Sequence, residues 1–314
     1  MSSLRTVHLL ALLLWPCALF PVAHAGEQKL WVDSRSVQVD ISDEFSEFAT
    51  ETIETWLIFL SKSLDQAYGE WPQRSWRYVV RPASAHGADP IPWAQVRRDE
   101  VNIVEFYISP DTSLEILKRS WTGYHEAAHL LIPYRGWGDT WFSEGLATYY
   151  QNLLQARMGL LDERGMWQKI HDGLVRGRED TRFDGESLWE VSAAMRQRGG
   201  FMRVYWTGVW YFLNIDVRLR RQSDGKVSLD SALRSLNDCC GNQPMSVPAM
   251  VARLDELNQL ALFEPSYQRA RNLTTMPDWA NLFASLGITV TNGRVSLQTE
   301  GPGATLRKGI SSAL

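Results

Sequence analysis

The hydrophobic pattern changes near Pro110, and this change divides the chain into two kinds of structure. Before it, the segments SWRYVVRPA and VNIVEFYISP are short, rich in Val, Ile and aromatic residues, and end at Pro82 and Pro110, which is typical of strands. After it, apolar residues recur at helical spacing almost throughout. The predicted helices cover residues 111–132, 141–160, 162–177, 186–197, 200–221, 228–236, 246–262 and 277–286. We therefore expect a small α/β lobe followed by a mostly helical lobe.

Two further elements complete this expectation. Residues 46–71 carry apolar side chains at helical spacing and stop before a proline, which predicts a long amphipathic helix. Asn292-Gly293 lies between two alternating runs and predicts a hairpin. The segment SAHGADPIPWAQ, between the two predicted strands, is expected to be a loop. No internal repeat or linker appears, so one compact unit is expected. Its lobes are residues 26–110, residues 111–286 and a tail over 287–314.

Residues 1–25 have a different pattern from the rest. Arg5 precedes an apolar run over residues 7–22, and the small-residue pattern Ala-His-Ala follows. This order is typical of a secretory signal peptide cleaved after residue 25. The alternative, an uncleaved anchor, is disfavoured because Pro16 and Pro21 interrupt the run and a span requires roughly 20 residues. We expect an exported protein, periplasmic or secreted from a bacterium, with no stable membrane insertion after cleavage.

Composition limits the partners of the chain. Its 314 residues are 45% hydrophobic and 22% charged, which is enough apolar material for a sizeable core. The formal net charge is −4, and the loss of Arg5 would make it more negative, so nucleic acid is not an expected partner. After cleavage only Cys239 and Cys240 remain, adjacent in NDCCGN. They can pair only with each other or stay as thiols, so a disulfide framework is excluded.

The stretch WTGYHEAAHLLIPYRGWGDTWFSEGLATYY, residues 121–150, places His125 and His129 four positions apart with Glu126 between them. On a helix these histidines share a face and can bind one ion, while Glu126 points at a bound water. Such a string occurs by chance in roughly one chain in a hundred of this length, so a third ligand is the test. Glu144 supplies one, because IPYRGWGDT breaks the first helix and the next helix can return toward the histidines.

The segment WFSEGLATYY, which follows the HExxH string, resembles the gluzincin metallopeptidases, whose third ligand lies in a Trp-x-x-Glu-Gly segment. The similarity is greatest to the glycyl aminopeptidase-like family and extends to the aminopeptidase N family. It covers roughly residues 110–240. The resemblance implies an α+β, thermolysin-like gluzincin catalytic domain with one zinc ion per chain, held by His125, His129 and Glu144. It also implies an edge strand that receives an extended substrate, for which residues 101–109 are the candidate.

A second block, YWTGVWYFLNIDVRLRRQSDGKVSLDSALRSL, is similar to the Tyr-x-Lys-Gly pattern of the glycyl aminopeptidase-like family. The resemblance implies that Tyr205 stabilises the oxyanion of the tetrahedral intermediate. Thr207 stands where these families usually have Lys. The alternative is that Tyr205 is a packed aromatic beside Trp206 and Trp210.

Other parts of the family pattern are missing. The chain has no Gly-x-Met-Glu-Asn segment before the histidines, which holds the free amino terminus of a substrate in these families, so aminopeptidase specificity is not implied. Glu105 could meet a substrate amine, but we expect a solvent-facing strand carboxylate. The candidates for orienting the zinc-binding histidines are Asp139, Thr140 and Thr148. Neither His171, expected to be a surface or packing residue, nor the loop residue His86 is an expected ligand.

The leading hypothesis is an exported zinc-dependent metallopeptidase acting on a peptide or protein substrate, with Glu126 as general base. The alternative from another class is a catalytically inactive gluzincin-fold protein that binds peptides or serves as a scaffold. The intact Glu126 argues against this alternative. A third option is hydrolysis of a non-peptide amide or ester at the same site. The sequence does not distinguish aminopeptidase from endopeptidase activity, and it does not predict an oligomeric state.

Overall fold

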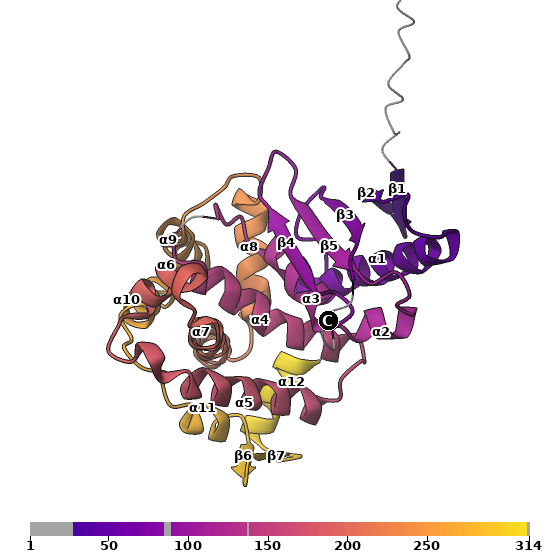
Figure 1. Ribbon diagram of the computed structural model, residues 1–314. Coiled ribbons are helices and arrows are strands. Elements are labelled where there is room, and N and C mark those ends of the chain that lie inside the picture. Colours follow the sequence, from indigo (N-terminus) through magenta and orange to yellow (C-terminus); the bar gives the residue numbers. More distant parts are fainter. Residues whose placement is uncertain (1–27, 85–88, 137, 313–314) are drawn as a thin grey trace, which may run out of the picture.

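The computed structural model describes residues 28–84, 89–136 and 138–312 (Figure 1). The expected signal peptide at residues 1–25 and the residue His86 lie outside these ranges. Within them, every helix is too short or too polar to cross a bilayer.

A five-stranded sheet forms the N-terminal part of the fold, in the order β1-β2-β3-β5-β4. The strands are β1 (Gln28–Val32), β2 (Arg35–Ile41), β3 (Arg77–Pro82), β4 (Trp93–Arg97) and β5 (Ile103–Ile108). The three central strands run parallel to one another, whereas β1 and β4 are antiparallel to their neighbours. The two outer strands of the sheet are therefore the two antiparallel ones.

The position of β4 corrects the expected edge strand. Glu105 of β5 lies opposite Val79 of β3 on one side and Gln95 of β4 on the other, so β5 is an inner strand. The prediction that residues 101–109 form the edge strand is wrong, and β4 takes that position. Its five residues, WAQVR, follow directly on a proline-rich stretch, and so short an alternation is difficult to distinguish from a loop. The strands β1 and β2 were not predicted either.

Helix α1 (Glu47–Tyr68) packs its apolar stripe against the sheet and the core. The Ser46 side chain accepts a hydrogen bond from the Ala49 amide and caps the first turn. Gly69 ends the helix with φ 85°, a left-handed conformation that glycine adopts without strain. The predicted helix over residues 46–71 is therefore confirmed. Trp56 on this helix meets Phe106 of β5 edge to face, with ring centroids 4.9 Å apart.

The predicted helix over residues 111–132 is divided in the structure. It forms α2 (Leu114–Arg119), α3 (Trp121–Ala128) and a short 3-10 helix, η1 (His129–Leu131). The break lies at Ser120, whose backbone is extended with φ −62° and ψ 126°. Asp89, in the loop before β4, accepts hydrogen bonds from the hydroxyls of Ser120 (2.8 Å) and Thr122 (3.0 Å). This contact fixes the start of α3 from a distant segment, which periodicity along the chain does not reveal.

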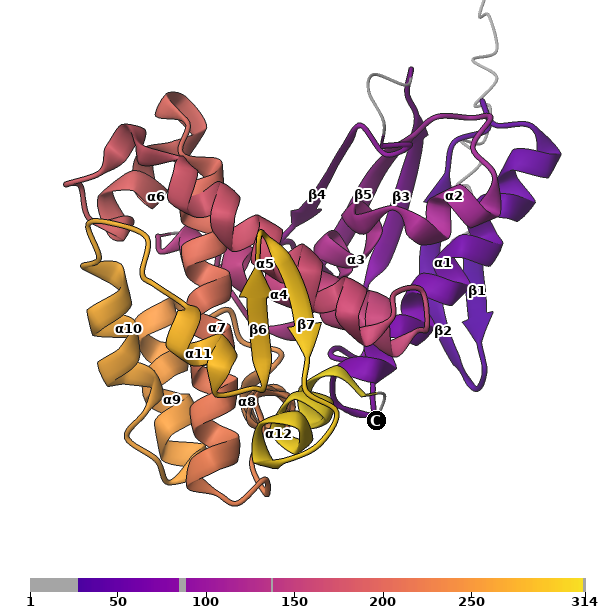
Figure 2. The same cartoon turned by 90° about the horizontal axis from the view of Figure 1, so that it is seen from below.

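The remaining elements build the helical part of the molecule. They are α4 (Thr140–Arg157), α5 (Glu163–Glu179), η2 (Thr181–Phe183), α6 (Leu188–Arg198), α7 (Phe201–Gln222), α8 (Leu229–Cys240), α9 (Val247–Asn258), α10 (Phe263–Arg271), α11 (Ala280–Ala284), the strands β6 (Ile288–Thr291) and β7 (Arg294–Leu297), and α12 (Pro302–Ser311). The predicted hairpin is present as β6 and β7. Helices α10 and α12 were not predicted. Figure 2 shows the sheet and the helical part side by side, with β4 on the side of the sheet nearest α6.

Helices α4 and α7 cross at two glycines. A Cβ atom on Gly145 would lie 2.4 Å from the Cα atom of Gly208, and a Cβ on Gly208 would lie 2.5 Å from the Cα of Gly145. Any larger residue at either position would collide with backbone. The pair therefore lets the two helix backbones touch directly beside Glu144.

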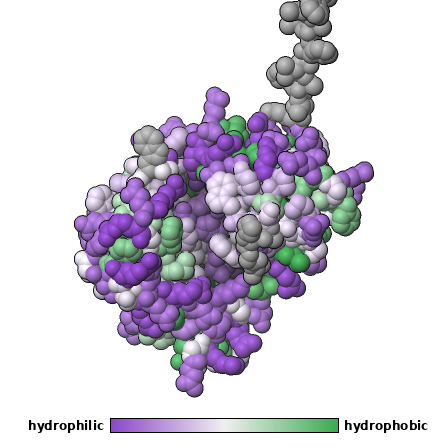
Figure 3. Space-filling view, in the orientation of Figure 1, coloured by the Kyte–Doolittle hydropathy of each residue, from purple (hydrophilic) through white to green (hydrophobic). Residues whose placement is uncertain are grey.

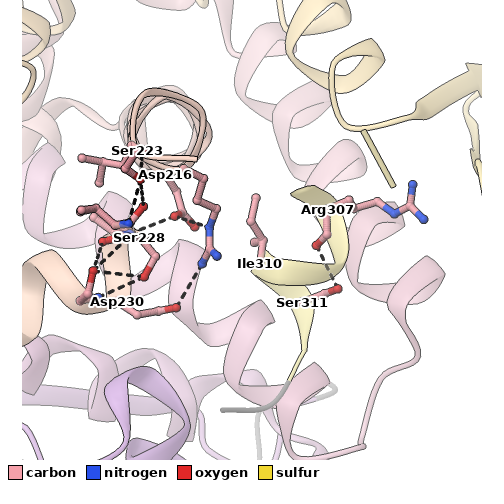
Figure 4. Close-up of polar contacts among 12 residues, drawn as sticks. Asp216, Ser223, Ser228, Asp230, Arg307, Ile310 and Ser311 are labelled. Carbon is pink, nitrogen blue, oxygen red and sulfur yellow. Dashed lines mark hydrogen bonds and ion pairs between the residues drawn. The ribbon is translucent and has the colours of Figure 1, made fainter. Parts of the chain in front are cut away.

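A buried polar network joins the C-terminal half to the rest of the fold. Arg157 of α4 donates to Asp230 of α8, with a distance of 2.9 Å from Nη2 to Oδ2, and also to the carbonyl oxygens of Gln66 and Ile310. Figure 4 shows Asp216, Ser228 and Asp230 gathered together, with the residues of α12 beside them. Arg157 thus links α1, α4, α8 and α12. In a different region, at the end of α8, Cys239 and Cys240 form a disulfide with each other.

Candidate metal centre

Three predicted ligands converge where α3 ends and α4 begins. His125 lies on α3 and His129 follows at the start of η1, so their rings share one side of the helix. The chain then turns back, and Asp139 adopts a left-handed conformation with φ 47° immediately before α4. The Asp139 carboxylate accepts hydrogen bonds from the Trp141 indole (3.2 Å) and the Tyr267 hydroxyl (2.8 Å). These contacts hold the turn that aims Glu144 at the histidines.

The ligand atoms lie close enough to bind one ion. Oε2 of Glu144 is 3.1 Å from Nε2 of His125 and 3.7 Å from Nε2 of His129. The three groups can each offer an atom within 4.8 Å of the other two. Tetrahedral zinc with ligand distances of about 2.1 Å requires neighbouring ligand atoms roughly 3.4 Å apart. Two imidazoles and a carboxylate are also ligands that zinc accepts in proteins. The donor set therefore fits a zinc ion.

The second nitrogen of each imidazole is held by α4. Nδ1 of His125 is 2.9 Å from Oε1 of Gln151, and Nδ1 of His129 is 3.0 Å from Oγ of Ser143. When Nδ1 carries the proton and donates it to these oxygens, Nε2 keeps its lone pair for a metal.

The residues expected to orient the histidines, Asp139, Thr140 and Thr148, do not do so. The Asp139 carboxylate binds Trp141 and Tyr267, and the Thr148 hydroxyl is buried without a hydrogen-bond partner among the described residues. Gln151 could have been found from the sequence. It follows Glu144 by seven residues, which is about two helical turns, so both side chains lie on the same helix face.

The electrostatics of the cluster differ from one ligand group to the next. Burial opposes charge on His125, but the hydrogen bond and the negative charge of Glu144 outweigh it and raise the pKa of His125. Burial would also raise the pKa of Glu144, but the imidazoles of His129 and His125 outweigh it and lower this pKa to about 2. Burial lowers the pKa of His129 to about 3, which keeps that imidazole neutral. The cluster thus keeps Glu144 ionised and the His129 imidazole neutral, the states in which both groups can serve as ligands.

A cavity of about 520 Å³ opens beside the three ligands and is lined by β4, α3, α4, α6 and α7. Figure 3 shows a hollow near the centre of this face of the molecule. Glu126 lines the cavity, and no described residue donates a hydrogen bond to its carboxylate. Burial raises the pKa of Glu126 to about 7.

Tyr205 of α7 lines the same cavity. Its ring stacks on His125, with centroids 5.8 Å apart and 14° between the ring planes. Burial and the charge of Glu144 raise the pKa of Tyr205, so the hydroxyl keeps its proton at neutral pH. The five residues singled out from the sequence therefore lie around one cavity.

Two arginines that line the cavity were not predicted from the sequence as site residues. Arg98 follows β4, and its Nη2 donates to the His129 carbonyl oxygen at 2.6 Å. Burial lowers the pKa of Arg98 to about 10, so it remains charged near neutral pH. Arg196 of α6 lines the cavity from another side. Ala94, Val96 and Arg98 are spaced by two residues, so on a strand their side chains lie on the same face. This spacing predicts the position of Arg98 only if β4 is known to be a strand.

Two other expectations have different outcomes. Glu105 is only 9% exposed and accepts a hydrogen bond from Gln95 Nε2 at 2.8 Å, because β4 covers it, so the expected solvent-facing carboxylate is wrong. Glu105 does not line the cavity. His171 is buried and packs against Trp279 and Phe283, as expected of a packing residue rather than a ligand.

Solved structures share this arrangement of elements. An aminopeptidase N family protein from Idiomarina loihiensis matches 84% of this chain and 49% of its own, with a TM-score of 0.59 and 15% identity. An M1 zinc metallopeptidase from Deinococcus radiodurans matches 80% of this chain and 51% of its own, with a TM-score of 0.52 and 17% identity. The chain shares the fold of the matched half of these structures.

A mutant of the Deinococcus radiodurans protein bound to a Tyr-Ser-Ala substrate matches at 18% identity with a TM-score of 0.51, covering 80% of this chain and 52% of the other. This chain therefore spans about half the length of the solved structures that it matches. No protein-family model and no curated protein sequence matches it. At these identities the likeness concerns the fold alone.

Proposed function

We propose that the protein is a gluzincin-type, thermolysin-like zinc peptidase that binds one zinc ion through His125, His129 and Glu144. The observation that carries this proposal is the set of three ligand atoms within 4.8 Å of one another, beside a cavity that also holds Glu126 and Tyr205. Each Nδ1 atom has its own hydrogen bond to a side chain of α4, which leaves both Nε2 atoms directed at Glu144. Those bonds are typical of histidines that orient toward a metal.

The chemistry divides among the residues of the cavity. Zinc supplies Lewis-acid polarisation of a carbonyl group. The Glu126 carboxylate, which has no hydrogen-bond donor among the described residues, accepts a proton from the attacking water and delivers it to the leaving nitrogen. The Tyr205 hydroxyl keeps its proton and donates a hydrogen bond to the oxygen on which negative charge develops.

The edge strand β4 provides a place for an extended substrate. Trp93 to Val96 line the cavity, and the side of β4 that faces away from β5 has no partner strand within the described sheet. A peptide can pair with these backbone groups as an additional strand. We propose that the substrate lies along β4 with its scissile bond facing Glu126. We also propose that the protein is exported and acts in the periplasm or outside the cell, on the pattern of residues 1–25.

The proposal is tested by comparing Glu126→Gln with Glu115→Gln in zinc-loaded protein. Glu115 lies on α2 with an exposed side chain, so this control makes the same chemical change outside the cavity. We expect Glu126→Gln to bind zinc like the wild type and to lose almost all hydrolysis of a broad peptide library, and Glu115→Gln to keep both. Binding of zinc and of peptides without any cleavage by the wild type would support an inactive peptide-binding protein instead.

A further inference from the structure

The charges of the cavity are unusual for a site that receives a free amino terminus. Its lining contains two arginines, Arg98 and Arg196, and two carboxylates, Glu126 and Glu144. The carboxylates are the proposed base and the proposed metal ligand, so neither is available to hold an ammonium group. Glu105, the nearby strand carboxylate, is bound by Gln95 and lies 3.8 Å from Nε of Arg97. A substrate therefore meets free positive charge in this cavity.

Arg98 is fixed at the edge of the metal centre. It follows β4 directly and lies on the same side of the strand as Ala94 and Val96, which line the cavity. Its Nη2 donates to the carbonyl oxygen of His129 at 2.6 Å. This contact holds one arm of the guanidinium, and none of the described carboxylates pairs with the rest of it. The remaining N–H donors are available to a ligand.

Arg196 adds a second positive charge to the same cavity. It lies on α6, is exposed, and has no ion-pair partner among the described residues. Tyr205 of α7 lines the same cavity. By contrast Arg198, two residues further on α6, pairs with Glu186 at 2.7 Å outside the cavity. Arg98 and Arg196 thus line the cavity without an ion-pair partner among the described residues, whereas Arg198 is paired and lies outside it.

We propose that the preferred substrate is a peptide that carries a carboxylate within one residue of the scissile bond, bound by Arg98 and attracted by Arg196. This inference rests on the proposed function and specifies its substrate class. A guanidinium with free donors binds a carboxylate through two parallel hydrogen bonds. The carboxylate belongs either to an acidic side chain or to the carboxyl terminus of the peptide, because both present the same group.

Four sets of hexapeptides, randomised at the other positions without Asp or Glu, test the proposal with zinc-loaded protein. One inner residue is fixed as Glu or as Gln, and each set has a free or an amidated carboxyl terminus. Mass spectrometry identifies the cleaved bond, and kcat/KM is measured for each set. We expect a carboxylate set to be cleaved about tenfold or more faster than the set that lacks both groups, with cleavage next to the carboxylate. Dependence on Glu assigns a side chain, and dependence on the free terminus assigns the terminal group.

Variants test whether the preference for a carboxylate depends on Arg98 and Arg196. Arg98→Gln should bring the ratio of the carboxylate to the neutral set close to one, Arg98→Lys should keep part of it, and Arg196→Gln should reduce it by a smaller factor. Arg198→Gln is the matched control on α6 and should leave the ratio unchanged. If Arg98→Gln does not fold, the lysine variant and Arg196→Gln give the same test. Equal cleavage of all sets, or a preference that survives every change at Arg98 and Arg196, overturns the proposal.

Failure of the proposed function has a different signature. If no set is cleaved, the protein is not a peptidase under these conditions, and equilibrium dialysis of the same four sets then decides the inference. Carboxylate-dependent retention that Arg98→Gln abolishes supports the arginine site without catalysis. Retention that is the same for the neutral set, or no retention at all, overturns it.

Discussion

His125 and His129 show which parts of a candidate metal site a sequence can predict. Their spacing of four places two rings on one helix face, and Glu144 follows from the break and return of the chain. Their partners Gln151 and Ser143 were missed, because each depends on how α4 lies against α3. Arg98 was missed for a similar reason, since its place in the cavity depends on β4 being an edge strand. Local spacing thus predicts ligands better than it predicts their surroundings.

The histidine partners should control zinc affinity. Ser143→Ala and Gln151→Leu remove the acceptors of the two Nδ1 protons, and we expect each to weaken zinc binding by about 10-fold to 100-fold. Thr148→Val is the control on the same helix, because its buried hydroxyl has no hydrogen-bond partner among the described residues. Competition with a chelator of known affinity measures the effect. Unchanged affinity in both variants would show that these contacts do not orient the ligands.

Tyr205 should act on turnover rather than on binding. Tyr205→Phe removes the hydroxyl but keeps the ring that stacks on His125, so zinc content and KM should stay close to those of the wild type. We expect kcat to fall by about 100-fold or more, as when one donor to a developing oxyanion is lost. Tyr124→Phe is the control, because its hydroxyl donates to the Lys118 carbonyl at 2.9 Å. Equal kcat in both variants would assign Tyr205 a packing role.

The long helices were predicted with sound bounds, whereas several short elements were missed. Helices such as α5 and α7 repeat their apolar pattern over several turns, and this repetition identifies them. The strands β1, β2 and β4 have five to seven residues each, and their stability comes from neighbours far away in the sequence. The start of α3 depends on Asp89, thirty-one residues before Ser120. The periodicity of a short segment does not reveal such long-range contacts.

We expect any side chain at Gly145 or Gly208, where α4 and α7 cross, to destabilise the fold. Gly208→Ala places a Cβ 2.5 Å from the Cα of Gly145 and 2.6 Å from the Trp141 carbonyl oxygen, so the helices must separate. We expect a loss of about 1–3 kcal/mol in the free energy of unfolding, measured by urea denaturation. Gly309→Ala is the helical control, since its nearest neighbour is the flexible end of Arg220 at 3.2 Å. Equal stability of the two variants would contradict the close crossing.

At the scale of the whole molecule, the C-terminal helix is part of the core rather than an appendage. Arg307 of α12 is 1% exposed and donates to Glu163 of α5 (3.0 Å), to the Leu286 carbonyl (3.0 Å) and to the Gln298 carbonyl (2.7 Å). Arg157 connects α12 to helices α1, α4 and α8. This core position was not predicted, because the tail contains proline and glycine at the start of α12. Buried ion pairs and hydrogen bonds therefore hold α12 against the core.

Arg157 should therefore be essential for stability. Arg157→Met leaves the buried Asp230 without its closest cation, and we expect a loss of about 3 kcal/mol or more in the free energy of unfolding. Arg234→Met is the control, because its ion pair with Glu70 is half exposed and such pairs contribute roughly 0–1 kcal/mol. Urea denaturation with one cooperative transition measures both. A loss at Arg157 no larger than that at Arg234 would show that the network does not hold these helices together.

The central claim is the position of the metal, and anomalous diffraction at the zinc absorption edge tests it most directly. Crystals of the zinc-loaded protein should show one strong peak per chain, within about 2.1 Å of Nε2 of His125, Nε2 of His129 and a carboxylate oxygen of Glu144. Crystals of Glu144→Ala, grown with the same zinc concentration, should lose that peak or most of it. A wild-type map with no peak between these three residues, or with its only peak elsewhere, would contradict the account.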